Sequence, residues 1–147
     1  MELLFLGTGA ADWKGPDPKT GEMRRNTAAL LDGRVLIDCG PDVPEALAAF
    51  GGDATRVSDV LLTHSHGDHF SLDTLRHLAD ARGDGPRLRL WAHPAALKQA
   101  APANDRVQFC PVQPGNPDLH RTQRAVWGKL GYKNYLTKSI MNILQRF

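Results

Sequence analysis

One short segment constrains this chain more than any other. Residues 64–69 read His-Ser-His-Gly-Asp-His, which places three imidazoles and one carboxylate within six positions. The apolar run 60–62 leads directly into this segment, so we expect a strand to end there. Neutral imidazole and carboxylate are ligands of zinc, and also of iron and manganese. A solvated polar loop is the alternative, but such a grouping of ligands is improbable by chance, and we favour a metal site.

The spacing within the segment supports this interpretation. If the chain stays extended beyond Leu62, His64 and His66 point to the same side, because side chains two positions apart share a face. They could then bind one metal together. The glycine at position 67 allows a sharp turn, after which Asp68 and His69 could serve a second metal.

The same segment resembles the His-x-His-x-Asp-His signature of the metallo-β-lactamase superfamily, and two other segments agree. Residues 3–10, Leu-Leu-Phe-Leu-Gly-Thr-Gly-Ala, resemble its first strand and glycine turn, and residues 35–40, Val-Leu-Ile-Asp-Cys-Gly, resemble its strand ending in Asp-x-Gly. The Phe-Leu-Gly-Thr-Gly opening and residues 24–27, Arg-Arg-Asn-Thr, are most similar to the phosphodiesterase branch. That branch includes ribonuclease Z and the phosphoribosyl cyclic phosphate phosphodiesterases. The resemblance covers residues 1–118.

The resemblance implies an α/β fold: the N-terminal αβ half of the four-layer αβ/βα sandwich. It also implies a metal-dependent hydrolase that cleaves a small-molecule or nucleotide phosphodiester through a metal-bound hydroxide. The family holds two zinc ions, with manganese or iron as alternatives. His64 and His66 would bind the first ion, and Asp68 and His69 the second. Asp68 would also be the catalytic residue that orients the hydroxide, and Asp38 would hold a histidine by a hydrogen bond.

The chain departs from the family pattern after His69. The family needs later histidines and a bridging aspartate, but only His77, His93 and His120 follow, and no aspartate follows Asp118. We expect His77 to have a surface or packing role on a helix, and His93 to be a loop residue, with a pocket-lining role as the alternative. His120 is the only late candidate for a third ligand, and it lacks the sequence context that the family uses there. Whether the chain is an enzyme therefore stays open. It could be an inactive fragment that binds one metal, or a homodimer could rebuild the sandwich.

The composition changes sharply near residue 118. All 16 acidic residues lie at or before Asp118, whereas six of the 18 basic residues follow it. We therefore divide the chain into a half domain, 1–118, and a basic, acid-free tail, 119–147. The tail could be a plain basic terminus, a nucleic-acid-binding or membrane-surface arm, or sequence foreign to the domain, and we favour the last. A nucleic-acid-binding module that uses this tail is the alternative from a different functional class.

The remaining patterns predict ordinary elements of a single soluble domain. No apolar stretch approaches the roughly 20 residues that span a bilayer, and the N-terminus lacks a basic leader, so we expect a cytoplasmic protein without a membrane partner. We interpret Cys39 as a small core residue. Asp32-Gly33 fits a tight turn of a hairpin, Asp42 and Glu45 have the spacing of a capping box, and Ser71 is a candidate N-cap. The expected strands are 2–6, 27–31, 34–37, 57–62, 88–92 and 107–112, and the expected helices are 42–50, 71–82 and a short one from Pro94.

Overall fold

The structure is a computed structural model that describes residues 2–11, 15–16, 19–101 and 105–112. The chain divides into two compact units, Met1–Pro111 and Val112–Phe147, and only the first is described below. The predicted basic tail, which contains His120, lies outside the described residues, and so does Asp118. The division at residue 118 and the nucleic-acid-binding role of the tail therefore stay predictions.

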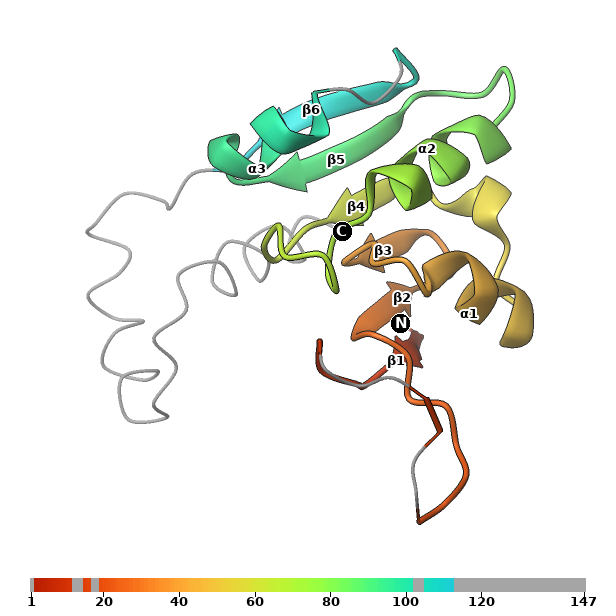
Figure 1. Ribbon diagram of the computed structural model, residues 1–147. Helices are drawn as coiled ribbons and strands as arrows, with labels where there is room; N and C mark the ends of the chain where they lie inside the picture. The colour runs from red at the N-terminus through yellow and green to blue at the C-terminus, as the bar shows by residue number, and fades with distance from the viewer. Residues whose placement is uncertain (1, 12–14, 17–18, 102–104, 113–147) are drawn as a thin grey trace, which may run out of the picture. The chain divides into compact units, whose positions relative to one another are not determined.

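Six strands of the described chain form one mixed sheet in the order β1-β2-β3-β4-β5-β6 (Figure 1). The first two pairings are antiparallel and the other three are parallel. The strands are β1 (Leu3–Gly7), β2 (Ala28–Leu31), β3 (Val35–Ile37), β4 (Asp59–Leu61), β5 (Leu88–Ala92) and β6 (Val107–Pro111). The helices are α1 (Val43–Ala49), the 3₁₀ helix η1 (Ala54–Arg56), α2 (Leu72–Ala81) and α3 (Pro94–Ala100).

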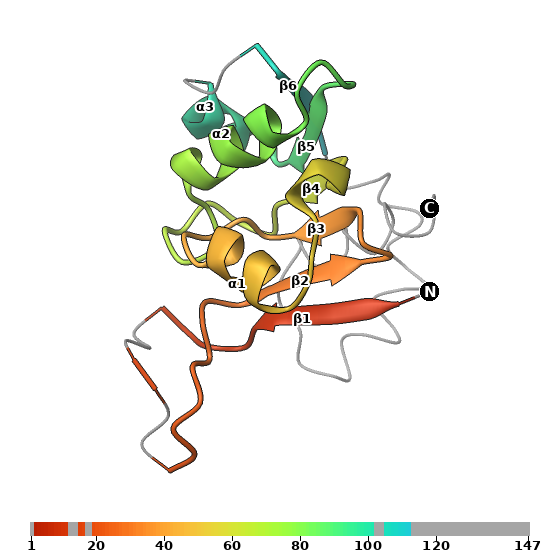
Figure 2. The ribbon, with the colours of Figure 1, turned by 90° about the vertical axis from the view of Figure 1, so that its right-hand side faces the viewer.

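The helices α1, α2 and α3 all lie on one face of the sheet (Figure 2). This follows from the topology, because β3 to β6 run parallel and each successive strand is added at the same edge of the sheet. Right-handed crossovers then place every connecting helix on the same face. The predicted α/β half sandwich, a sheet with helices against one face, is confirmed.

The core lies between this sheet face and the helices. Alternate residues of the strands supply it, including Leu30, Leu36, Val60 and Leu90, and Leu62 adds to it just after β4. Leu75 and Leu78 enter it from α2, and Leu47 enters it from α1. Cys39 is fully buried within the same cluster, so its predicted role as a small core residue is confirmed.

Two local features match the sequence closely. Asp32 and Gly33 have φ values of 50° and 66°, and the Arg34 N–H donates to the Leu31 carbonyl, as expected of a tight Asp-Gly turn. The register pairs Leu31 with Val35, so Arg34 is one additional residue between the turn and β3. Ser71 is the N-cap of α2, and its hydroxyl accepts a hydrogen bond from the Thr74 N–H.

The predicted capping box at α1 is wrong. The Asp42 carboxylate accepts a hydrogen bond from the Asn26 N–H (2.7 Å), and Glu45 pairs with Arg25 (2.8 Å). Both acidic groups thus bind the segment that precedes β2 and make no cap within the described chain. Hydrogen bonds and ion pairs to distant residues have replaced the local cap at the start of α1. The helix spans only Val43–Ala49.

Strand β4 is also shorter than expected. It ends at Leu61, so the chain has left regular strand geometry before it reaches His64. Residues 54–56, predicted as a connection, form the 3₁₀ helix η1, in which the Asp53 side chain accepts a hydrogen bond from the Thr55 N–H. None of the described helices is long and apolar enough to cross a membrane.

Candidate metal centre

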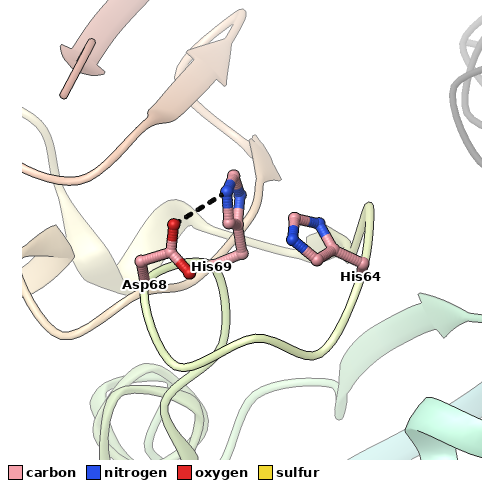
Figure 3. Close-up of side chains that lie close together, drawn as sticks. All are labelled: His64, Asp68 and His69. Carbon is pink, nitrogen blue, oxygen red and sulfur yellow. Dashed lines mark ion pairs between the residues drawn. The ribbon is translucent and has the colours of Figure 1, made fainter. Parts of the chain in front are cut away.

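The candidate site lies at the carboxyl end of β4, where the chain turns toward α2. The His66 carbonyl accepts hydrogen bonds from the N–H groups of His69 and Phe70 (2.9 and 2.8 Å), which closes a tight turn over residues 66–70. The turn brings Asp68 and His69 back toward His64 (Figure 3). It is this turn, not a continued strand, that gathers the ligand atoms.

The turn is held against the end of β3 by backbone contacts. The Cys39 N–H donates to the His69 carbonyl (2.8 Å), and the Ser71 N–H donates to the Cys39 carbonyl (2.9 Å). Gly40 lies so close to Asp68 that a Cβ atom at position 40 would overlap the Asp68 carbonyl oxygen. The absence of a side chain at Gly40 therefore lets the turn approach β3.

Three of the four predicted ligands converge. One ligand atom each from His64, Asp68 and His69 lies within 4.8 Å of the others, and all three side chains are half-buried. His66 lies outside this group among the described residues. Its exposed ring packs edge-on against His64 with a centroid separation of 4.7 Å, so its role as a ligand stays a prediction. The His64 and His69 rings are closer, at 4.1 Å.

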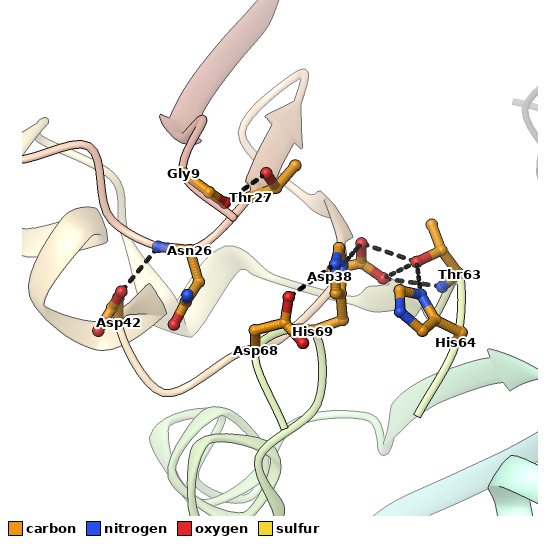
Figure 4. Close-up of polar contacts among 9 residues, drawn as sticks. All are labelled: Gly9, Asn26, Thr27, Asp38, Asp42, Thr63, His64, Asp68 and His69. Atoms are coloured by element: carbon orange, nitrogen blue, oxygen red, sulfur yellow. Dashed lines mark hydrogen bonds and ion pairs between the residues drawn. The ribbon is translucent and has the colours of Figure 1, made fainter. Parts of the chain in front are cut away.

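Asp38 lies between His69 and Thr63 and contacts both (Figure 4). Its carboxylate, 2% exposed, lies 2.7 Å from Nδ1 of His69 and accepts hydrogen bonds from the backbone N–H and hydroxyl of Thr63, both at 2.8 Å. The predicted hydrogen bond between Asp38 and a histidine is thus confirmed for His69. The residue has a φ of 61°, a left-handed conformation that aspartate tolerates better than most residues.

The bond to Asp38 fixes what the other nitrogen of His69 can do. A carboxylate only accepts, so Nδ1 carries the proton and, in a neutral ring, Nε2 carries a lone pair. That nitrogen lies 3.1 Å from Oδ2 of Asp68. A lone pair and a carboxylate oxygen repel one another at this distance unless a proton or a metal ion lies between them.

The electrostatics of His64 also favour a ligand. Burial, and then the positive charge that His69 can carry, lower the pKa of His64 below its ordinary value. The imidazole is therefore neutral at neutral pH, which is the form that binds metals. The donor set fits a divalent ion, since two imidazoles and one carboxylate match the three protein ligands of many catalytic zinc sites.

Other predicted candidates lie elsewhere. His77 is exposed on α2, so the surface role holds and the packing alternative does not. His93 is the N-cap of α3, and its Nδ1 accepts a hydrogen bond from the Ala95 N–H, so it has a structural role in place of the expected loop position. Sequence reasoning missed Thr63, whose hydroxyl lies 3.0 Å from Nδ1 of His64. Its position directly before the first histidine was the only available signal.

A family described as Anti-Pycsar protein Apyc1 matches residues 1–99, two thirds of the chain and the whole site. The chain belongs to the Apyc1 family. An Anti-Pycsar protein Apyc1 of Bacillus phage 010DV004 is 38% identical over 73 residues, which cover 47% of this chain and 25% of that protein.

Two further proteins carry the resemblance to the phosphodiesterase branch. Ribonuclease Z of Mycobacterium marinum is 39% identical over 72 residues, covering 48% of this chain and 24% of the enzyme. The crystal structure of the short form of human tRNase Z superposes with a TM-score of 0.54 and 27% identity, covering 69% of this chain and 37% of that one. Membership of the metallo-β-lactamase superfamily, in its phosphodiesterase branch, is confirmed. The chain spans about a quarter of the length of the curated relatives it matches.

Proposed function

We propose that this chain binds a divalent metal ion, with zinc as the first candidate and manganese or iron as alternatives, and hydrolyses phosphodiester bonds. His64, Asp68 and His69 would hold the ion, and His66 would add a further ligand. The observation that carries the proposal is the contact between Nε2 of His69 and Oδ2 of Asp68 at 3.1 Å. Asp38 already occupies Nδ1 of His69, so the two facing acceptors leave a place for a cation.

The residues of the site divide the work. A bound ion would supply Lewis-acid chemistry and would make water a nucleophile at neutral pH. Asp38 keeps His69 oriented with Nε2 toward Asp68, and the low pKa of His64 keeps that ring available. Asp68 would act as the catalytic residue, because its half-buried carboxylate can accept a proton from an attacking water.

The similarity to ribonuclease Z and to tRNase Z supports a phosphodiester substrate, and it makes RNA the first macromolecular substrate to test. A small or nucleotide phosphodiester fits the same chemistry. The chain matches only part of these relatives, so a second copy could supply the late ligands of the family pattern. A homodimer is thus part of the proposal.

The direct test is hydrolysis of a bis-aryl phosphate and of a single-stranded RNA, with and without added zinc. We expect zinc-dependent turnover that a chelator abolishes and that zinc restores. A His64→Ala/His69→Ala variant should lose the activity. A His77→Ala variant is the matched control, because that histidine is exposed on α2 away from the site.

The outcomes separate the alternatives. Zinc-dependent turnover in the wild-type chain and in His77→Ala, but not in the double variant, would support the hydrolase. Zinc binding without turnover would favour the inactive metal-binding fragment. Turnover that survives in the double variant would refute the proposed site.

A further inference from the structure

The Thr63 hydroxyl occupies a place between Asp38 and His64 that the proposed chemistry has not yet used (Figure 4). Its Oγ1 atom lies 2.8 and 2.9 Å from the two carboxylate oxygens of Asp38, and 3.0 Å from Nδ1 of His64. The backbone N–H of Thr63 donates separately to Asp38 at 2.8 Å. The backbone contact fixes where Thr63 lies, and the hydroxyl is left to connect the two side chains.

The number of protons decides the direction of these hydrogen bonds. A hydroxyl has one proton to donate, and an ionised carboxylate can only accept. The Thr63 hydroxyl therefore donates to Asp38, and its oxygen can then only accept from His64. For this contact to be a hydrogen bond, Nδ1 of His64 must carry the proton, and the lone pair of the neutral ring lies on Nε2.

We infer that Thr63 is a positioning residue that fixes the tautomer of His64, so that Asp38 orients two imidazoles at once. It holds His69 directly and His64 through the Thr63 hydroxyl. Both rings then direct an unprotonated Nε2 to the proposed ion. This inference rests on the proposed function only for its consequence in metal binding, since the tautomer itself exists without a metal.

A Thr63→Val variant removes the hydroxyl and retains the branched shape and the backbone bond to Asp38. Thr63→Ser keeps the hydroxyl. Thr63→Ala is a second way to remove the hydroxyl if the valine variant does not fold. The first readout is the protonated nitrogen of His64 in zinc-free protein. Long-range ¹H–¹⁵N spectra of the imidazoles show it at about pH 8, above the ordinary histidine pKa. The second readout is zinc affinity, from competition with a chromophoric chelator.

We expect His64 to carry its proton on Nδ1 in the wild-type chain and in Thr63→Ser. In Thr63→Val and Thr63→Ala we expect the Nε2-protonated form to appear, because Nδ1–H has lost its acceptor. Zinc affinity should fall about 10- to 100-fold in these two variants, as is usual when the outer partner of a ligand histidine is removed. Thr63→Ser should stay within about 3-fold of the wild-type affinity.

Two results would overturn the inference: an Nδ1-protonated His64 that persists in folded Thr63→Val, or an Nε2-protonated His64 in the wild-type chain. If the wild-type chain binds no zinc, the proposed function fails, yet the tautomer spectra still decide the role of Thr63. If zinc binds and the tautomer does not respond, the metal site stands and the role of Thr63 is refuted.

Discussion

Asp38 and Asp59 are two buried aspartates of neighbouring strands with opposite kinds of partner. Asp59 begins β4, is 1% exposed, and accepts hydrogen bonds from Arg89 (2.7 Å), the Trp91 indole (2.8 Å) and the Ser58 hydroxyl (2.7 Å). Asp38 follows β3, and its partners are Thr63 and His69. A guanidinium is always charged, so the charge of Asp59 is neutralised within the fold.

The partners of Asp38 differ because each of them also contacts a candidate metal ligand. The neutral imidazole of His69 presents a second nitrogen to Asp68, and the hydroxyl of Thr63 presents its oxygen to His64. A buried aspartate therefore completes a structural cluster at position 59, whereas at position 38 it orients candidate metal ligands. Both acids are buried and both accept from a hydroxyl, so what separates them is whether the donor in turn contacts a candidate ligand, as Thr63 and His69 do.

The largest effect should come from filling the space that the turn at residues 66–70 needs. A Gly40→Ala change would force the new methyl group against the Asp68 carbonyl oxygen. We expect unfolding free energy to fall by about 3 kcal/mol, the upper range for overpacking, and zinc binding to weaken. Gly67→Ala is the matched control, since a Cβ there meets nothing within 4 Å. Equal urea midpoints for both variants would refute this account of the turn.

Asp59→Asn should cost stability without touching the site. The substitution removes the charge that pairs with Arg89, whose side chain is 40% exposed, so we expect a loss of about 2 kcal/mol in unfolding free energy. Zinc affinity should stay within about 2-fold, because additive behaviour is expected at distant sites. Urea unfolding and chelator competition measure the two quantities. A large loss of zinc affinity would contradict the division between the two aspartates.

Asp38→Asn should show the reverse pattern. An asparagine amide no longer holds the Nδ1 proton of His69 as a carboxylate does, so we expect zinc affinity to fall about 10- to 100-fold, or about 1.4 to 2.7 kcal/mol. The same chelator competition applies, with Asp59→Asn as the control. Unchanged zinc affinity in a folded Asp38→Asn variant would show that the histidines are positioned without Asp38.

The effect with the least weight at neutral pH concerns Cys39, which lies beside Asp38, because its contribution changes only in alkaline solution. Burial raises the pKa of its thiol to about 12, well above its ordinary value, so the folded thiol stays protonated where the unfolded one ionises. Stability should therefore fall as pH rises from about 9 toward 12, by at most about 1.4 kcal/mol per pH unit. Urea midpoints of the wild-type chain and of Cys39→Ala across this range measure it. Identical pH slopes would exclude a contribution from Cys39.

Much of this fold could be predicted because the local signals agree with the tertiary structure. The Asp-Gly turn, the alternating strands and the Ser71 cap depend on neighbours in the sequence, and all are present. The capping box predicted for Asp42 and Glu45 does not form, because their partners Asn26 and Arg25 lie far away in the sequence. A prediction from local residue spacing cannot include partners that are distant in the sequence.

The site divides in the same way. The composition of residues 64–69 is enough to predict a metal site. The predicted geometry, however, put His64 and His66 on the same side of an extended chain. The structure instead gathers His64 with Asp68 and His69 through a turn. Thr63 was missed because its significance depends on Asp38, which is 25 residues away in the chain and adjacent in space.

The central claim is that His64, Asp68 and His69 form a metal site, and zinc content per chain tests it most directly. Purified wild-type, His64→Ala/His69→Ala and His77→Ala proteins would be dialysed against the same zinc buffer and analysed by elemental mass spectrometry. We predict about one zinc ion per chain, as expected for three protein ligands, in the wild-type and His77→Ala proteins and none in the double variant. Equal zinc in all three proteins, or none in the wild-type protein, would contradict the claim.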